Sequence, residues 1–219
     1  MAAPQIKAKT ASERHVTLWD PVVRTTHWGI AIVVLGNALV TKGGSLVHVS
    51  LGWAGMALLL LRLIWGALGP SEARFSAFPP SPLAALRHMR QLVSGTVRET
   101  PSHNPAGAMM AYAIWASLVV VTVTGLVLTG GATPMQIAND QAAVASGDWS
   151  ALIKESDEGA SDGEDETGLR HTAEEVHKMA ANLLLLLAVL HVAGVFVEGR
   201  ALRRNLVAPM VLGQNARRK

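Results

Sequence analysis

The sequence contains no cysteine, and this absence excludes several kinds of site at once. Disulfide bonds, thiolate metal sites, iron–sulfur clusters and covalent CxxCH haem attachment all need cysteine thiols. Any bound metal or cofactor must therefore be held by histidine, methionine, carboxylate or backbone groups. The polar N-terminal stretch MAAPQIKAKTASERHVTLWD also lacks the apolar core and cleavage site of a signal peptide, so we predict none.

Charged residues are scarce as well. They make up 16% of the 219 residues, whereas a soluble domain normally carries about a quarter. Half of the residues are hydrophobic, and the charges are clustered, so long windows are nearly free of them. This pattern predicts an integral membrane protein. The pI near 9.6 is explained by basic loops on one side of a membrane, and we predict no nucleic-acid partner.

Four apolar segments predict membrane-spanning helices, at residues 25–41, 48–68, 107–129 and 176–198. We therefore expect an all-α membrane protein, with one domain over residues 1–219 built as an up-down bundle of four helices. The loop at 130–175 has an acidic middle, Lys154–Glu166, which is either a docking surface for a basic partner or a mobile, solvated spacer. In the loop at 69–104, the stretch Leu83–Val97 predicts a short amphipathic helix at the membrane interface.

Loop charges predict the orientation of the bundle. Outside the spans, fourteen Lys and Arg residues lie on the side that holds both termini and the loop at 69–104, and three lie on the other side. Cytoplasmic loops of membrane proteins carry the excess of Lys and Arg. Both termini are therefore expected in the cytoplasm, and the chain in the bacterial cytoplasmic (inner) membrane.

The fourth apolar segment carries two histidines, His177 and His191, fourteen residues apart. Fourteen residues make just under four helical turns, so both imidazoles leave the same face of the helix. At ~1.5 Å per residue they lie roughly 21 Å apart along the axis, near opposite edges of a ~30 Å hydrocarbon layer. This spacing suggests two coordination positions stacked across the membrane.

Two further histidines match these depths. His27 begins the first span on the cytoplasmic side, and His48 begins the second span on the outer side. We therefore predict an outer pair, His48 with His177, and an inner pair, His27 with His191. Ionisable groups at membrane depth are costly and usually functional. Two bis-histidine sites stacked in a four-helix bundle suit two b-type haems. Small residues near the ligands either clear space for a porphyrin or allow close helix packing: Gly52, Gly55, Ala180, Ala181 and Gly194.

Two arginines are candidates to pair with haem propionates at the inner level. Arg62 lies fourteen residues after His48, the spacing that also separates the two histidines of the fourth span. The alternative for Arg62 is that it extends to the cytoplasmic interface. Arg24, one turn before His27, is the second candidate.

The other four histidines have simpler explanations. His15, His88 and His171 lie in the N-terminal tail and in loops, and we expect them at the surface. His103 precedes the third span, where helix capping or loop packing is at least as good an explanation as ligation.

These residues resemble the bacterial cytochrome b561 and nickel–iron hydrogenase cytochrome b-subunit family. The stretches that carry the resemblance are WDPVVRTTHW (19–28), HVSLGWAGMALLLLRLIWG (48–66), RFSAF (74–78), HNPAGAMM (103–110) and HVAGVFVEGRALRRNLVAPMVLG (191–213). The resemblance implies a four-helix membrane bundle with two haems b, whose axial ligands are His27, His48, His177 and His191. It also implies electron exchange with membrane quinone and a redox partner. The long acidic outer loop departs from compact members of the family.

We therefore expect an electron-transfer protein of a respiratory chain. With two histidines on each iron, neither haem has an open position for a substrate, so quinol chemistry needs a separate pocket. By position, the candidates for that pocket are His103, Glu174 and Glu175. The periplasmic partner is either a c-type cytochrome or a redox enzyme, and the acidic loop favours a basic soluble partner.

Three alternatives stay open at this level. The chain is alternatively the cytochrome b anchor subunit of a hydrogenase or dehydrogenase complex, and a homodimer is the alternative for its assembly. A rival from another class is a histidine-lined metal-ion transporter. Transport sites usually gather their ligands at one midplane location, whereas these histidines form two levels.

Overall fold

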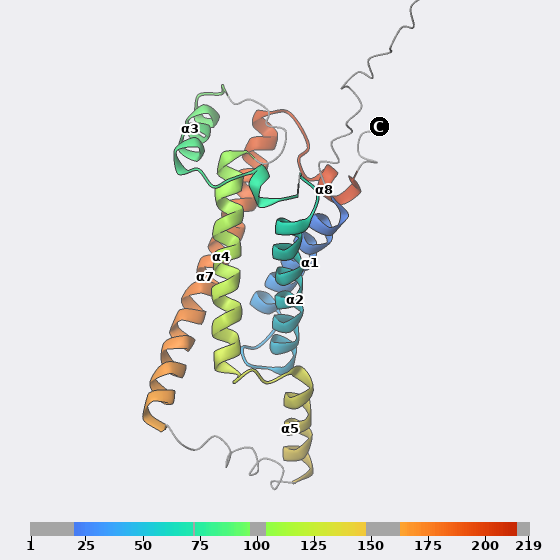
Figure 1. The fold of residues 1–219 in the computed structure, drawn as a ribbon, viewed down its shortest axis with the longest axis vertical. Coiled ribbons are helices and arrows are strands. Elements are labelled where there is room, and N and C mark those ends of the chain that lie inside the picture. The colour runs from blue at the N-terminus through green and yellow to red at the C-terminus, as the bar shows by residue number, and fades with distance from the viewer. Residues whose placement is uncertain (1–19, 72, 97–103, 148–162, 214–219) are drawn as a thin grey trace, which may run out of the picture.

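The computed structural model describes residues 20–71, 73–96, 104–147 and 163–213 (Figure 1). Within these ranges the chain is all-helical, without a strand. Its α-helices are α1 (Pro21–Leu39), α2 (Leu46–Leu68), α3 (Pro82–Val93), α4 (Pro105–Leu128), α5 (Pro134–Ser146), α7 (Gly163–Ala201) and α8 (Ala208–Leu212), with a 3-10 turn, η2, at Phe75–Ala77.

Local sequence explains where the helices begin. Asp20 accepts a hydrogen bond from the backbone N–H of Val22 at 2.8 Å, and Pro21 occupies the first turn of α1. A short polar side chain satisfies an otherwise unpaired N–H at such a position, and proline there has no N–H to lose. Ser81, Asn104 and Thr133 cap α3, α4 and α5 in the same way, each directly before a proline, and Ser45 caps α2 without one.

The four predicted spans are confirmed as helices long and apolar enough to cross a membrane: α1, α2, α4 and the part of α7 from Gly168 to Ala201. The ends differ from the prediction, most of all for α7. This helix has 39 residues, which is about 58 Å at 1.5 Å per residue and much longer than a ~30 Å hydrocarbon layer. Its first turns extend beyond the predicted span, into the predicted outer loop.

Both extramembrane loops contain helices. The predicted amphipathic helix is confirmed as α3, which ends at Val93 rather than at residue 97. In the predicted outer loop, α5 is a helix that the sequence reasoning did not anticipate. Most of the acidic stretch Lys154–Glu166 lies outside the described residues, and its last residues, from Gly163, form the start of α7 rather than loop.

The spans form two helical hairpins, which Figure 1 shows side by side. In one hairpin α1 packs along α2, and in the other α4 packs along α7, while closer contact between the hairpins comes mainly from α2 with α4. At one end of the bundle α3 packs on α4, and at the other end α5 packs on α2. The short helix α8 returns to the start of α1, where Trp28 Nε1 donates a hydrogen bond to the carbonyl oxygen of Met210 at 3.2 Å.

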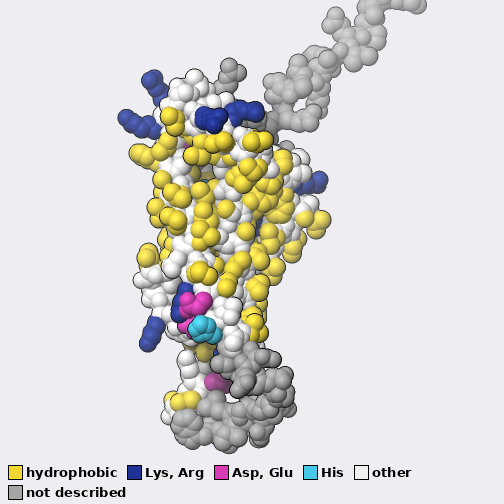
Figure 2. Space-filling view, turned by 90° about the vertical axis from the view of Figure 1, so that its left-hand side faces the viewer, with side chains coloured by type: hydrophobic (Ala, Val, Ile, Leu, Met, Phe, Trp, Pro, Cys, Tyr) yellow, Lys and Arg dark blue, Asp and Glu magenta, His cyan; other side chains and the backbone are white. Residues whose placement is uncertain are grey.

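The surface of the bundle is apolar around its middle. Figure 2 shows a band of hydrophobic side chains, with Lys and Arg gathered at the end that holds α3 and the C-terminal part of α7. Large hydrophobic side chains are exposed on every span, for example Ile32, Leu61, Val123 and Val189. Such a continuous apolar surface suits the interior of a lipid bilayer and not water. The chain is therefore a multi-pass membrane protein.

Candidate functional site

The structure brings the four intramembrane histidines together in two pairs. His27 on α1 faces His191 on α7, with ring centroids 6.1 Å apart. His48 on α2 faces His177 on α7, with ring centroids 6.3 Å apart. These are the two pairs that the depths of the histidines suggest. Their role as metal ligands stays a prediction.

Each pair joins the two hairpins. Helix α7 packs closely along α4 but not along α1 or α2, so the imidazoles of His177 and His191 reach across from α7 to the other hairpin. The fourteen residues between the two α7 histidines keep the pairs roughly 21 Å apart along the helix. The bundle therefore brings two separate histidine pairs together at different levels, with α7 common to both.

Two threonines contact the outer pair, and sequence reasoning missed both. Thr41 Oγ1 lies 3.2 Å from Nδ1 of His48, and Thr124 Oγ1 lies 2.9 Å from Nδ1 of His177. A hydrogen bond at Nδ1 fixes the ring and leaves Nε2 as the free nitrogen of each imidazole. Gly125 lets α4 approach closely here, because a Cβ at this position would lie 3.4 Å from Cε1 of His177. In the sequence, the one sign of this contact is a polar residue, Thr124, next to a glycine, Gly125, within an apolar span.

The inner pair has different surroundings. Nδ1 of His27 is buried and has no hydrogen-bond partner among the described residues. The neighbouring Thr26 does not supply one, because its hydroxyl bonds to the carbonyl oxygens of Val22 and Val23 in its own helix, at 2.8 and 3.1 Å. The two histidine pairs therefore differ in their second layer of contacts, although their ring separations are nearly equal.

Arg62 is buried, with only 4% of its surface exposed. Its guanidinium carbon lies 4.9 Å from the ring centroid of Trp115 and 5.5 Å from that of Phe75, and Nη2 donates a hydrogen bond to the carbonyl oxygen of Ala73 at 3.4 Å. Nη1 is buried without a hydrogen-bond partner in the described part of the chain. The alternative that Arg62 extends to the aqueous interface is therefore wrong, because aromatic rings enclose its charged end.

Arg24 is occupied by the C-terminal segment. Its Nε donates to the carbonyl oxygen of Met210 at 3.0 Å, and its Nη2 donates to that of Val211. These bonds fasten α8 to the start of α1. Arg24 therefore has fewer free donors for a propionate than Arg62.

Comparison with known proteins gives one finding. The family model for prokaryotic cytochrome b561 matches residues 18–213, which is nearly the whole chain. The chain belongs to the prokaryotic cytochrome b561 family. No curated protein and no solved structure matches it significantly. Membership makes this chain a membrane b-type cytochrome with a role in electron transfer, and it implies bound haem b.

The residues present in this cytochrome b561 fit a haem at each level. Two metal–nitrogen bonds of about 2 Å, plus roughly 1 Å from each nitrogen to its ring centre, put two axial imidazole centroids about 6 Å apart. The observed separations are 6.1 and 6.3 Å. Beside the ligands, a Cβ added at Gly52 or Gly194 would meet nothing within 4 Å, so these glycines border open space. Gly55 instead packs α1 on α2, since a Cβ there would lie 3.0 Å from Cγ1 of Val33.

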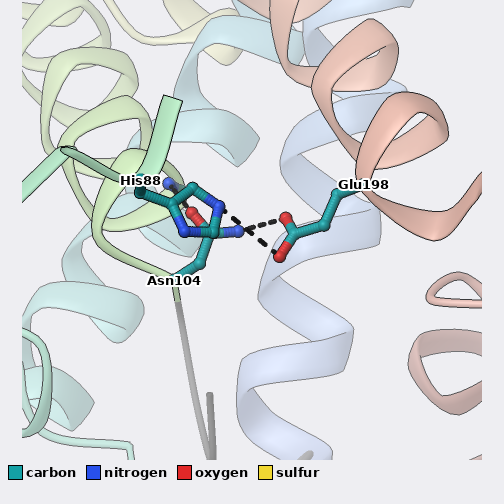
Figure 3. Close-up of polar contacts among 4 residues, drawn as sticks. His88, Asn104 and Glu198 are labelled. Carbon is teal, nitrogen blue, oxygen red and sulfur yellow. Dashed lines mark hydrogen bonds and ion pairs between the residues drawn. The ribbon is translucent and has the colours of Figure 1, made fainter. Parts of the chain in front are cut away.

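His88 is not a surface residue, contrary to the expectation from sequence. It is buried at the end of the bundle that holds α3, and its Nε2 lies 3.8 Å from Oε1 of Glu198 (Figure 3). Asn104, which caps α4, donates from Nδ2 to Oε2 of the same carboxylate. The three side chains join α3, α4 and α7. Sequence reasoning missed the cluster because it expected His88 on the exposed side of the interfacial helix.

The other residues considered from sequence lie elsewhere. His15 and His103 are outside the described residues, and His171 is exposed on α7, as expected. The two candidates for a quinol pocket that are described, Glu174 and Glu175, are also exposed on α7, where Lys178 Nζ pairs with them at 2.7 and 3.2 Å. Their carboxylates thus take part in a surface ion-pair cluster.

Proposed function

We propose that this cytochrome b561 is a membrane electron carrier that holds two haems b at two levels. His48 and His177 would be the axial ligands of the outer haem, and His27 and His191 those of the inner haem. The observation that supports this proposal best is the meeting of the four histidines in two pairs across the hairpins. Histidine is a usual axial ligand of b-type haem, and the chain has no cysteine for covalent attachment.

Bound haem would supply a reversible one-electron change at its iron. The chain's own residues would hold and orient it: two imidazoles fix each group between the hairpins, and the apolar spans exclude water. Since two histidines leave no axial position free, each site would relay electrons and not bind a substrate at the metal. At the inner level, the buried guanidinium of Arg62 is the better of the two arginine candidates for pairing with a propionate.

The proposed setting is the bacterial cytoplasmic membrane, with both termini and α3 in the cytoplasm. The basic residues in and before α3 and around the end of α7 support this orientation: Arg74, Arg87, Arg90, Arg200, Arg203 and Arg204. The quinone pool is the proposed membrane partner, and a c-type cytochrome or a periplasmic redox enzyme is the proposed outer partner. An anchor subunit of a hydrogenase or dehydrogenase complex would use the same haem core.

The rival function, metal-ion transport, has less support. Among the described residues, no three histidine, aspartate or glutamate side chains gather where they could hold a metal ion. The intramembrane histidines meet in twos, at separate levels, and not at one midplane site.

The test is the haem content of the purified full-length protein. Difference spectra before and after dithionite, with pyridine haemochrome quantification, are expected to give sharp b-type bands and two haems per chain. One haem per chain would remove one of the two proposed sites. A colourless protein from haem-replete cells would refute the proposal.

A further inference from the structure

The two histidine pairs differ in what their Nδ1 atoms contact. Both rings of the outer pair have a threonine hydroxyl at Nδ1: Thr41 at 3.2 Å from His48, and Thr124 at 2.9 Å from His177. In the inner pair, Nδ1 of His27 is buried and meets no hydrogen-bond partner in the described part of the chain. The threonines come from two different helix ends, so the outer site is supported on both sides.

The direction of these hydrogen bonds follows from the other contacts of the threonines. A hydroxyl group has one proton to donate. Thr124 Oγ1 lies 2.7 Å from the carbonyl oxygen of Val120, and Thr41 Oγ1 lies 3.1 Å from that of Asn37. A carbonyl oxygen only accepts, so each threonine proton has a local acceptor other than the imidazole. When Nε2 binds iron, Nδ1 must carry the ring proton, so the imidazole is then the donor to each threonine. For His177 the backbone of Val121 is a second acceptor.

An imidazole that donates from Nδ1 becomes a more basic ligand through Nε2. A more basic axial ligand stabilises the oxidised, more positively charged iron, and this lowers the reduction potential of the haem. On the inner side, the charged side chains of buried Arg62 and partly buried Glu198 have opposite signs, so their effects on a potential oppose each other. The threonine contacts are made only at the outer histidine pair among the described residues, and both act to lower the reduction potential of the outer haem.

We propose that Thr41 and Thr124 are positioning residues that hold the outer haem at a lower potential than the inner haem. Electrons would then run downhill from the outer haem to the inner haem. Carriage of electrons from a periplasmic donor towards the cytoplasmic end would therefore be favoured over the reverse. This inference rests on the proposed function, because it needs two bis-histidine haems.

The test is a spectroscopic redox titration of purified Thr124→Val and Thr41→Val proteins. Valine keeps the shape of threonine but cannot accept a hydrogen bond. Only the part of this bond that is stronger in the oxidised state changes the potential, so its loss is expected to favour reduction of the outer haem by at most about fivefold. At 59 mV per tenfold for a one-electron couple, this is an upward shift of at most about 40 mV. The inner haem should keep its potential, and Thr124→Ser, which retains the hydroxyl, should keep the original outer potential.

The matched control is Thr129→Val. Thr129 is the C-cap of α4, the helix that holds Thr124, and among the described residues its hydroxyl bonds only to carbonyl oxygens of that helix, Gly125 at 3.0 Å and Leu126 at 3.3 Å. Its replacement should shift neither potential. The outer haem is identified as the one that His48→Ala removes.

The outcomes separate the two proposals. A protein without haem refutes the proposed function itself. A wild-type protein with two haems overturns only this inference if the outer haem already has the higher potential, or if Thr41→Val and Thr124→Val leave both potentials unchanged.

Discussion

Replacement of single axial histidines gives the sharpest test of the two proposed sites. The perturbation is a set of four alanine variants, at His27, His48, His177 and His191. The two pairs have separate partners, with ring centroids 6.1 and 6.3 Å apart within each pair. They are also roughly 21 Å apart along α7. Loss of a ligand at one level should therefore leave the other level intact, so each variant is expected to bind one haem per chain instead of two.

The assay must report which haem is lost. Redox titration of the remaining haem in each purified variant gives a potential that serves as a label. The variants at His48 and His177 are expected to keep one potential, and those at His27 and His191 the other. Imidazole added during expression or refilling with haem should restore the missing site, because it can occupy the space of the removed ring. Such recovery separates loss of a ligand from misfolding.

The control for these variants is His171→Ala. His171 lies on the same helix as two of the proposed ligands but is exposed, so its replacement should leave two haems. The reasoning is refuted if the variants at His27 and His48 retain the same potential. It is also refuted if His171→Ala loses a haem.

Three further predictions concern the end of the bundle that holds α3 and the orientation of the chain. Gly66→Ala would put a Cβ into the ring of Phe75, closest to Cζ. We expect this overpacking to cost about 1–3 kcal/mol, seen as a lower melting temperature in detergent, and an unchanged melting temperature would contradict it. His88→Ala removes a buried partner of the carboxylate at the end of α7, and a similar loss, of about 1–3 kcal/mol, is expected in the same assay. Because the chain has no cysteine, single cysteines can report topology: in intact spheroplasts a membrane-impermeant maleimide should label Asn139→Cys on α5 and spare Arg90→Cys on α3. The opposite labelling would invert the orientation.

The histidine pairs could be predicted from the sequence because a helix has a constant rise and rotation per residue. Fourteen residues fix both the direction and the separation of His177 and His191, whatever the rest of the chain does. Loop charges then order the spans by direction, which matches depths without any knowledge of packing. This is why the two pairs and the four spans could be predicted, although the helix ends moved by several residues.

The contacts that threonines make with the paired histidines could not be predicted in this way. Thr124 and His177 are 53 positions apart, and their meeting depends on how α4 packs against α7. No periodicity within one helix determines that packing. Gly125 at the contact shows the reason, since two helices approach closely only where a small residue allows it.

His88 shows a different limit. The amphipathic pattern of α3 is real, but its large apolar side chains are exposed, among them Leu83, Leu86, Met89 and Val93. In a soluble protein such a face would pack on the core, and the polar face would meet water. At a membrane interface the apolar face turns to lipid. The opposite face then packs on the protein, which buries a histidine that the sequence places in solvent.

For Arg62 the sequence leaves two interpretations open, pairing with a haem propionate or extension to the cytoplasmic interface, and the structure favours the first. A guanidinium that extended to water would need no partner, whereas a buried one needs hydrogen bonds or a counter-charge. No ion pair joins Arg62 to a carboxylate among the described residues, and Asp20 accepts hydrogen bonds from Val22 and Trp65 instead. Aromatic rings and a single carbonyl oxygen are a weak match for five donors. The unused donors therefore favour an anionic group on the inner side of the bundle, and a haem propionate is the one that the proposed function would bring there.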